Sequence, residues 1–455
     1  IAASAACACA VGALLLFRGR RATTQFFQRE ARGLVSLGWI LILALGGLPY
    51  LIDGALGPID AFFESTSGFT TTGSTVIVDI EAVDKSLLFW RSYTHWLGGI
   101  GIVVLFITVL PYLGVGGKQL FKSESSGPDP RALTPRIKDT AWILLKIYLL
   151  LTLAQTVALM FAGMDLYDAL CHTFGTLATG GFSPRQASIA AFDSLAVEII
   201  VIVFLLLAST NFGLFFAMSK GDWRALIRNT EWRAMMGIFV GATLLITLNL
   251  LGMQGHAPMG PEPPTPDYSI GGALRVAAFQ VASLFATAGF VSEDYDTWPH
   301  LSRFVLVALM CIGGSAGSTS GGIKVARVVI LCKLAFWRIE RAFRPKTIRA
   351  VRINGVVLDE QIQRNVFAFF TIYAGVFVLA SAAMSGVGLP FTSAVSSVAA
   401  TLNGVGPGLD YVGAVRDYAA VPGAGKLILC LCMLLGRLEF LSVLVLFMPS
   451  FWRQR

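Results

Sequence analysis

The chain has 455 residues, of which 55% are hydrophobic and only 14% are charged, and its mean hydropathy is +0.71. Soluble domains carry about 25% charged residues, so this composition excludes a soluble globular protein and indicates an integral membrane protein. The net charge of +8 does not indicate nucleic-acid binding, because the basic residues gather in short loops between apolar runs. The seven cysteines form no CxxC pair and are interpreted as small core residues rather than disulfides or a metal site.

The apolar runs predict one extra N-terminal helix followed by four repeats. The chain begins at Ile1 without methionine, so some N-terminal sequence is expected to be missing, and residues 1–17 are interpreted as the end of a span. A span needs about 20 apolar residues, whereas runs of about 10–14 are more often re-entrant or buried. Each repeat comprises a span, a short helix, a glycine-bearing extended segment and a second span. The predicted spans and short helices are 33–52, 58–68 and 87–110; 140–162, 166–177 and 195–218; 234–252, 271–285 and 301–335; 365–385, 390–402 and 425–448.

These elements divide the chain into an extra helix with a basic loop (1–30) and repeats at 31–138, 139–230, 231–362 and 363–455. Both spans of each repeat have basic ends on the same side, so these loops are expected in the cytoplasm. The short helix and its extended segment then enter from the outer side and return to it. Outer loops are mostly acidic, and acid around a pore mouth raises the local cation concentration. The alternative is that acid collects outside only because base is retained inside.

Four glycine-centred segments interrupt the apolar pattern at a nearly constant interval. Their last glycines lie 108, 108 and 117 residues apart (73 to 181, 181 to 289 and 289 to 406), and such a period indicates a repeated structural unit. Non-helical backbone at membrane depth is tolerated only where it is buried in protein or lines a water-filled path. The sequence therefore predicts four walls of one pore, formed by Thr70-Thr71-Thr72-Gly73, Ala178-Thr179-Gly180-Gly181, Ala286-Thr287-Ala288-Gly289 and Asn403-Gly404-Val405-Gly406.

The chemistry of these segments suits a dehydrated alkali cation. Backbone carbonyls in a ring replace lost water without adding net charge. To aim successive carbonyls at one axis, the backbone must visit conformations that glycine adopts freely. Each preceding short helix would aim its C-terminal end at the centre, with roughly half a negative charge. The alternative is that these glycines are helix-packing notches, but packing glycines would lie inside long spans rather than before polar outer loops.

The residues carry a family resemblance over essentially the whole chain from residue 30 onward. The four segments resemble the filter segments of the Trk/Ktr/HKT potassium transporter superfamily, and within it the bacterial TrkH type. Further matching stretches are Trp90-Arg91-Ser92, Trp96-Leu97-Gly98-Gly99-Ile100-Gly101 and Leu434-Leu435-Gly436-Arg437-Leu438-Glu439. The resemblance implies an all-α membrane protein with four span–pore-helix–span units around a pseudo-fourfold pore, preceded by two extra helices, of which one is present here.

The resemblance also implies the residues that meet the ion. A serine at a filter-glycine position goes with sodium permeation in the family, and all four positions here are glycine, which implies potassium. One departure is Gly404, where the family pattern has asparagine. By position, the coordinating residues are expected to be Thr71, Thr72, Gly73, Thr179, Gly180, Gly181, Thr287, Ala288, Gly289, Gly404, Val405 and Gly406.

The last span of the third repeat is interrupted by a glycine-rich stretch that cannot remain helical in lipid. Residues 313–322 include five glycines, each costing about 1 kcal/mol relative to alanine in a helix. The order of a phosphate-binding loop is absent, because Ile323 separates Gly322 from Lys324. The stretch resembles the family's intramembrane loop, which obstructs the pore and moves aside on activation; the alternative is a passive kink. The expected gating residues are Gly313, Gly314, Gly317, Ser318, Gly321, Gly322, Lys324 and Arg437.

Arg437 lies near the middle of the last span, where a charged side chain usually faces the bundle interior. Carbonyls of loop 313–322 are its expected partner, and the alternative is a structural salt bridge to another span. His95 is interpreted as a packed core histidine rather than a ligand, and Glu198 is assigned no role.

Three functions were weighed. Potassium uptake through a gated, channel-like pore agrees with the four segments and the glycine-rich loop. A sodium- or proton-coupled potassium symporter would need midplane carboxylates, and Glu439 is the one candidate among the central span positions. A membrane enzyme would need converging His, Asp, Glu or Ser, and the four histidines are scattered.

The resemblance further implies a place and partners. The chain is expected in the bacterial inner membrane, in contact with lipid, as a homodimer. A cytosolic ring of nucleotide-binding, TrkA-like regulatory subunits is expected to control the gate, with no nucleotide bound by this chain itself. The basic stretch Lys333–Arg364 offers a docking face for such a partner.

Overall fold

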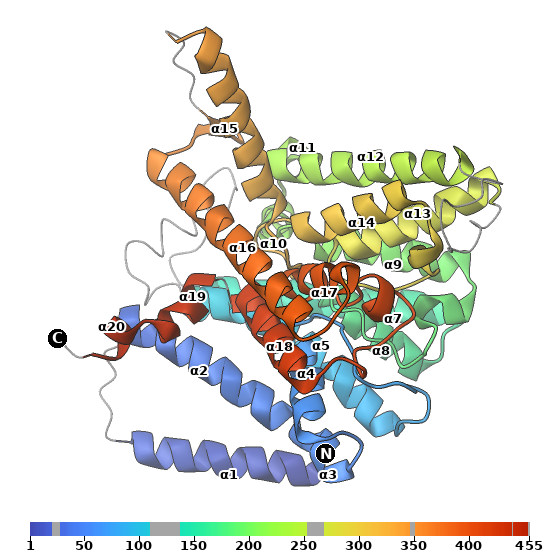
Figure 1. Cartoon of the computed structure of the whole chain (residues 1–455), viewed down its shortest axis with the longest axis vertical. Coiled ribbons are helices and arrows are strands. Elements are labelled where there is room, and N and C mark those ends of the chain that lie inside the picture. Colours follow the sequence, from blue (N-terminus) through green and yellow to red (C-terminus); the bar gives the residue numbers. More distant parts are fainter. Residues whose placement is uncertain (21–27, 110–136, 253–267, 346–350, 439, 454–455) are drawn as a thin grey trace.

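The computed structural model describes residues 1–20, 28–109, 137–252, 268–345, 351–438 and 440–453 (Figure 1). These parts are almost entirely helical, and the two short strands β1 (Arg352–Ile353) and β2 (Val356–Val357) pair antiparallel in one hairpin. The connection after the predicted span 87–110, most of the connection between 252 and 271, and Glu439 lie outside the described residues.

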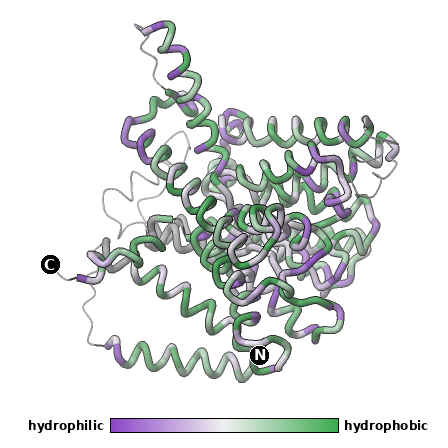
Figure 2. Tube along the Cα trace, in the orientation of Figure 1, coloured by the Kyte–Doolittle hydropathy of each residue, from purple (hydrophilic) through white to green (hydrophobic). Residues whose placement is uncertain are grey.

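Five described helices are long and apolar enough to cross a membrane, or six if the bent pair α9 (Leu195–Ala208) and α10 (Phe212–Ser219) counts as one span. The apolar residues of these helices face outward over much of their length, and Figure 2 shows the hydrophobic colouring along them. The five are α1 (Ala2–Gly19), α2 (Gln28–Gly46) with the residues up to Asp53, α7 (Ile137–Phe161), α12 (Thr230–Gly252) and α16 (Glu360–Gly386). α5 (Lys85–Val109) is a further long helix.

Four short helices lie inside this outer set, and nearly every residue in their C-terminal halves is buried. Local sequence sets their starts: Asp165 and Ser269 cap two of them by accepting backbone N–H groups, and Pro58 occupies the first turn of a third. These helices are α4 (Pro58–Phe69), α8 (Leu166–Leu177), α13 (Ile270–Phe285) and α17 (Phe391–Asn403).

The last long helix closes the arrangement on the first repeat. α18 (Gly423–Leu438) packs against both α17 and α4, so the C-terminal repeat contacts the N-terminal one. One apolar cluster joins them through Phe63, Val398, Leu402 and Leu434. After α18 come α19 (Phe440–Leu444), η5 (Val445–Phe447) and α20 (Pro449–Trp452).

Two predicted spans are broken. The span expected at 195–218 is the pair α9 and α10, bent by 89° at residues 209–211. A polar run explains the break, because Asn211 starts α10 by accepting the Gly213 N–H at 2.7 Å. The span expected at 301–335 is α14 (His300–Ile312) and α15 (Val325–Phe343), separated by the glycine-rich loop.

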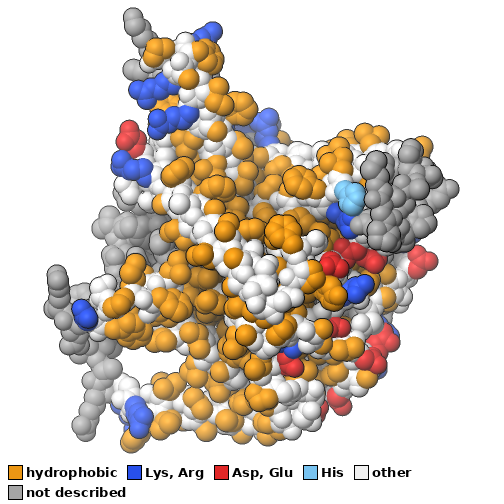
Figure 3. Space-filling view, in the orientation of Figure 1, with side chains coloured by type: hydrophobic (Ala, Val, Ile, Leu, Met, Phe, Trp, Pro, Cys, Tyr) orange, Lys and Arg blue, Asp and Glu red, His pale blue; other side chains and the backbone are white. Residues whose placement is uncertain are grey.

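The remaining helices α3 (Leu48–Asp53) and α11 (Arg224–Arg228), with η2 (Ser188–Phe192), η3 (Tyr295–Thr297) and η4 (Asp410–Val412), lie in connections. α15 and α16 extend together beyond the body of the molecule and are joined through the β1–β2 hairpin (Figure 1). Figure 3 shows most acidic side chains on the right-hand side of the view and basic side chains on α15 and near the C-terminus, which agrees with the predicted charge asymmetry.

Candidate ion pathway

The four glycine-centred segments begin where the four buried helices end, and all four helices end in the same way. The third residue of each segment donates its N–H to a carbonyl five residues earlier, which is the six-to-one bond of a Schellman cap. These bonds run from Thr72, Gly180, Ala288 and Val405 to Ser67, Gly175, Ser283 and Ala400, at 2.9, 2.7, 2.8 and 2.8 Å. The same C-terminal helix cap therefore precedes all four segments, although their sequences differ.

The second residue of each segment has a left-handed backbone. Thr71, Thr179 and Thr287 have φ values of 53°, 53° and 60°, and Gly404 has 67° in the fourth segment. A left-handed conformation costs an L-residue about 1–2 kcal/mol, and it is rare for a β-branched residue. Gly404 adopts it without a Cβ penalty. Strain held at three equivalent threonines indicates a functional constraint on the carbonyl directions.

The last glycine of each segment is left-handed as well. The φ values of Gly73, Gly181, Gly289 and Gly406 are 89°, 82°, 78° and 99°, while the residue between each left-handed pair has negative φ. Reversing the hand of the backbone at alternate residues turns successive carbonyls toward the same side of the chain. Only glycine supplies this conformation without steric cost.

The four segments also contact one another in a closed ring. A Cβ added to Gly73, Gly181 or Gly289 would lie 2.1, 1.9 or 1.9 Å from the carbonyl oxygen of Gly180, Ala288 or Val405, respectively. A Cβ on Gly406 would lie 2.7 Å from the Thr72 oxygen, which returns to the first segment. Each glycine thus makes room for the middle carbonyl of the next segment. A side chain at any of these four glycines would displace the neighbouring carbonyl, so main chain alone fits at these positions.

The ring is distinct from a side-chain metal site. Among the described residues no group of three His, Cys, Asp or Glu side chains could hold a metal ion. The four helices end at the ring, where their dipoles contribute partial negative charge. The ligands that this arrangement offers to a cation are neutral oxygens, with no formal counter-charge. Neutral ligands allow the cation to leave as readily as it enters.

The glycine-rich loop lies against the ends of three of these helices. The Gly321 N–H donates to Thr287 Oγ1 at 2.6 Å, and a Cβ on Gly321 would lie 2.0 Å from the Asn403 oxygen. The Thr319 hydroxyl donates to the Leu177 carbonyl at 2.9 Å. The loop therefore reaches the second, third and fourth segments from the side on which the short helices end.

Arg437 contacts both the loop and the first repeat. Its 8% exposed side chain donates to the Thr319 carbonyl at 2.8 Å and to the Gly98 carbonyl at 2.9 Å. Lys324 precedes α15 with a φ of 80°, and its Nζ donates to the Ser320 carbonyl. A cavity of about 50 Å³ between the loop and α18 is lined by both basic residues, together with Asn403 and Tyr373. Two cationic groups thus lie beside the loop.

Two groups that hold the loop were not predicted from the sequence. The first is the break between α9 and α10, where Ser209 O accepts the Ser315 N–H at 2.9 Å. The second is the buried carboxylate of Glu231, which accepts the N–H groups of Ala316 and Ala326 at 2.7 and 3.2 Å. The polar run Ser209-Thr210-Asn211 inside an apolar stretch was a signal for the first. Glu231 gave no signal, because an acid at the start of a span is ordinary.

A largely buried carboxyl group lies on the side of the ring opposite the short helices. Asp296 follows the third segment, and its Oδ2 accepts the Asp410 N–H at 3.2 Å. Burial, with a smaller contribution from the nearby Asp294, raises the pKa of Asp296 to about 6. Glu198, to which no role was assigned, pairs with Arg275 at 2.8 Å and joins α9 to α13.

A multi-pass helical protein with a ring of main-chain oxygens at its centre belongs to the class of membrane ion transport proteins and is not an enzyme. The TrkH family model, described as "Cation transport protein", matches residues 1–454. The chain belongs to the TrkH family.

Relatives and a solved structure agree with this assignment. The chain is 38% identical over 453 residues to the Trk system potassium uptake protein TrkH of Escherichia coli (strain K12), covering 98% of this chain and 91% of that one. It is 40% identical over 447 residues to the protein of the same name from Halomonas elongata, covering 97% and 90%. The crystal structure of the potassium transporter TrkH from Vibrio parahaemolyticus superposes with a TM-score of 0.86 at 37% identity, over 97% of this chain and 90% of that one.

Proposed function

We propose that this chain takes up potassium across the bacterial inner membrane through the ring of main-chain oxygens. The twelve proposed coordinating residues are Thr71, Thr72, Gly73, Thr179, Gly180, Gly181, Thr287, Ala288, Gly289, Gly404, Val405 and Gly406. One observation carries this proposal: each of four filter glycines lies within van der Waals contact of the neighbouring segment's carbonyl, and the fourth returns to the first. The relatives named above are potassium uptake proteins, which supports K⁺ as the ion.

The physical argument concerns dehydration. A potassium ion that enters the ring loses water, and carbonyl oxygens from four segments replace it. Glycine at all four positions keeps every segment close to its neighbour, so the oxygens surround one axis. A serine hydroxyl at one position would push a carbonyl away and supply a different oxygen, and we expect K⁺ over Na⁺ preference to fall.

The glycine-rich loop is proposed to be the gate, with Gly313, Gly314, Gly317, Ser318, Gly321, Gly322, Lys324 and Arg437 as its working residues. Support comes from the contacts of Gly321 with Thr287 and Asn403, which keep the loop against the ring. Arg437 holds the loop through the Thr319 carbonyl. Movement of the loop must break these hydrogen bonds, so they favour a closed pore.

The test is rubidium uptake into vesicles that contain the purified chain, with sodium as the competing ion. Wild type should accumulate Rb⁺ in preference to Na⁺. The substitution Gly289→Ser should lower that preference, whereas Gly241→Ser, at an exposed glycine of α12 with open space around it, should not. Equal selectivity in wild type and Gly289→Ser would remove the third segment from the filter.

Gating is tested in the same vesicles by shortening the loop within residues 313–322. Basal Rb⁺ uptake should rise, because fewer contacts hold the loop beneath the ring. A pore that stays closed or unchanged would count against a gate at this place.

Coupled symport remains the second candidate to be tested. Two of the buried carboxylates, Glu64 and Glu198, are paired with Arg91 and Arg275 at 2.6 and 2.8 Å, which disfavours these two as proton carriers. Acidifying the outside at fixed potassium should leave the reversal potential of the current unchanged if the pore is uncoupled. A shift toward the proton equilibrium potential would instead support symport.

The assembly is part of the proposal. We propose that the chain acts as a homodimer and that a cytosolic, nucleotide-binding TrkA-like ring controls the loop. The extension of α15 carries exposed Arg338, Arg341 and Arg344 and suits docking of an acidic protein surface. Replacing these three arginines with glutamine should weaken binding of the regulatory protein without changing the ion selectivity of the isolated chain.

A further inference from the structure

We propose that Glu64 and Arg91 are positioning residues for ion selection: their buried ion pair fixes the first pore segment against the second without touching the ion. This inference rests on the proposed function, because it assigns these side chains a part in the same ring. Each end of the ion pair holds the backbone that leaves one pore segment.

The first end of the pair holds the backbone that leaves the first segment. Glu64 lies in α4 and has no exposed surface, and Arg91 in α5 is 2% exposed. Arg91 Nε donates to Glu64 Oε1 at 2.6 Å. The same carboxylate accepts the Thr75 hydroxyl and the Val76 N–H, both at 2.9 Å. Glu64 therefore fixes the two residues that lie two and three positions beyond Gly73.

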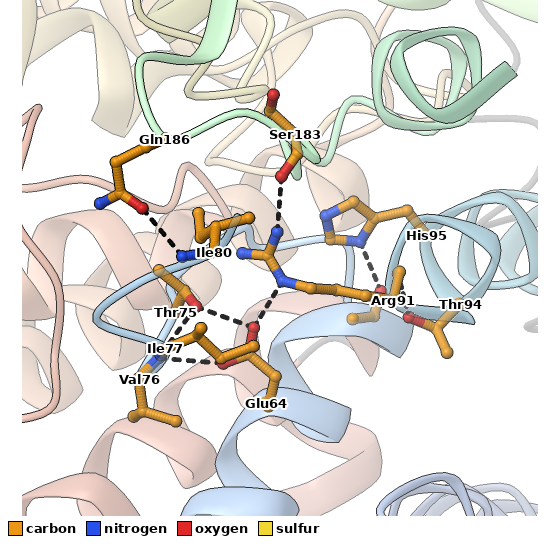
Figure 4. A network of polar contacts seen from close by, with 11 residues as sticks. Glu64, Thr75, Val76, Ile77, Ile80, Arg91, Thr94, His95, Ser183 and Gln186 are labelled. Carbon is orange, nitrogen blue, oxygen red and sulfur yellow. Dashed lines mark hydrogen bonds and ion pairs between the residues drawn. The ribbon is translucent and has the colours of Figure 1, made fainter. Parts of the chain in front are cut away.

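The second end of the pair holds the second repeat. Arg91 Nη1 donates to the Ser183 carbonyl at 2.9 Å, two residues beyond Gly181. Its guanidinium carbon lies 3.6 Å from the centroid of the Phe182 ring, in the geometry of a cation–π contact. Figure 4 shows Arg91 between Glu64 and Ser183, with Thr75 and Val76 on the other side of the carboxylate. One guanidinium thus joins the exits of two neighbouring segments.

α5 contacts the same two segments one turn further along. The His95 Nδ1–H donates to the Gly68 carbonyl at 2.7 Å, near the end of α4. On its other side, the His95 ring would lie 2.5 Å from a Cβ at Gly180. His95 is fully buried, as predicted for a packed core histidine. Arg91 and His95 together make α5 a rigid spacer between the first and second segments.

The equivalent positions in the other repeats show that the ion pair is specific to this junction. Nine residues before each filter glycine stand the fully buried residues Glu64, His172, Gln280 and Ser397. His172 Nε2 lies 3.0 Å from Ser183 Oγ, and Gln280 Nε2 donates to the Glu293 carbonyl at 3.3 Å, each within its own repeat. Only the first of these four positions is charged, and only there does the partner reach into the next repeat.

The pair is placed where a small movement reaches the ring. The Gly180 oxygen lies 2.1 Å from the Cβ position of Gly73, so the two segments are already at the closest approach that glycine allows. If the hydrogen bond from Arg91 to the Ser183 carbonyl is lost, the second segment can move away from the first, and the ring widens between these two segments. A wider ring fits K⁺ less closely, so K⁺ loses more stabilisation than the smaller, more strongly hydrated Na⁺. The preference for K⁺ over Na⁺ therefore falls.

The test is Arg91→Lys in the vesicle assay. Lysine keeps the charge and can remain beside Glu64, but its single ammonium group cannot also reach Ser183 in the fork geometry of a guanidinium. The K⁺/Na⁺ permeability ratio should fall about tenfold, which corresponds to about 1.4 kcal/mol. The amount of folded, inserted protein is measured in parallel by size-exclusion chromatography.

The matched control is Arg275→Lys. It alters another arginine pair between α9 and α13, in which Arg275 donates to the Glu198 and Asp193 carboxylates rather than to backbone that leaves a pore segment. Arg275→Lys should keep the wild-type ratio. Equal losses in the two variants would mean general weakening between repeats and would overturn the proposal, as would a wild-type ratio in Arg91→Lys.

A second variant tests the proposal if Arg91→Lys does not fold. Thr75→Val keeps the side-chain shape and removes the hydroxyl that donates to Glu64. It should lower the permeability ratio in the same direction by a smaller factor, and a wild-type ratio would overturn the proposal. Failure of the proposed function is distinguishable, since wild type itself would then show no preference for K⁺.

Discussion

A methyl group added at one of the four ring glycines proposed as the filter gives the sharpest prediction, because the clash differs among the four positions. In Gly289→Ala the new Cβ would lie 1.9 Å from the Val405 oxygen, and 2.6 Å from the Pro407 ring. Real Cβ atoms essentially never approach other atoms within about 3.0 Å, so the carbonyl must move by at least about 1.1 Å. In Gly406→Ala the same Cβ would lie 2.7 Å from the Thr72 oxygen, which needs a shift of only about 0.3 Å.

Both substitutions carry a similar backbone penalty. Gly289 and Gly406 have φ values of 78° and 99°, and alanine in this region costs about 1–2 kcal/mol. The difference between the two variants therefore reports the displaced carbonyl rather than backbone strain. A displacement of about 1 Å in a ring of fixed ligands removes most of the fit to one ion, comparable with the hundredfold losses that such shifts cause in other preorganised sites.

The assay is the K⁺/Na⁺ permeability ratio from reversal potentials in planar bilayers. Gly289→Ala should lose selectivity by about one to two orders of magnitude, and Gly406→Ala should lose less than tenfold. Gly241→Ala, on the exposed face of α12, serves as the control for substitution of a membrane glycine. If Gly406→Ala is as severe as Gly289→Ala, or if both retain the wild-type ratio, the reasoning from carbonyl displacement is wrong.

Three further predictions concern the loop and the outer surface. Thr287→Val removes the acceptor of the Gly321 N–H, so basal Rb⁺ uptake should rise several-fold, and unchanged uptake would contradict the contact's role in closure. Glu231→Gln weakens two charge-assisted hydrogen bonds to the loop and the start of α15 and should likewise raise basal uptake, whereas a lower uptake would count against it. The pKa of Asp296 is raised to about 6, so the folded state binds its proton more tightly than the unfolded state, and its ionisation destabilises the fold as pH rises through 6. Asp296→Asn should therefore raise the melting temperature at pH 7.5 and flatten its change between pH 7 and pH 5; an equally steep pH dependence in the variant would refute this.

The sequence was informative about the ring because its requirements are local. The left-handed backbone conformation favours glycine at its own position, whatever the distant contacts are. Composition and interval alone were therefore enough to recognise Gly73, Gly181, Gly289 and Gly406. The short helices were predicted close to their observed bounds, as with 166–177 and α8, because length and flanking polar residues limit a buried helix. The glycine-rich interruption before Lys324 was predicted for the same kind of local reason.

Distant contacts were not available to such reasoning. The break between α9 and α10 has a local polar run, but hydrogen bonds of Ala208 and Ser209 with a loop more than 100 residues away also hold it, and hydropathy alone predicted an unbroken span. Glu64 and Arg91 are 27 residues apart on different helices, and no periodicity joins them. Their partner Ser183 comes from another repeat.

The amino-acid sequence by itself determined the membrane class, the number of glycine segments and the glycines that can turn left-handed, since each depends on side-chain polarity or on the absence of a Cβ. The left-handed conformation of Thr71, Thr179 and Thr287 depends on the tertiary structure. Only the tertiary structure decided which carbonyl faces which glycine, which helix ends the loop covers, and which buried charges pair. Those relations depend on how four repeats close around one axis, and closure is a property of packing between residues that are far apart in the chain.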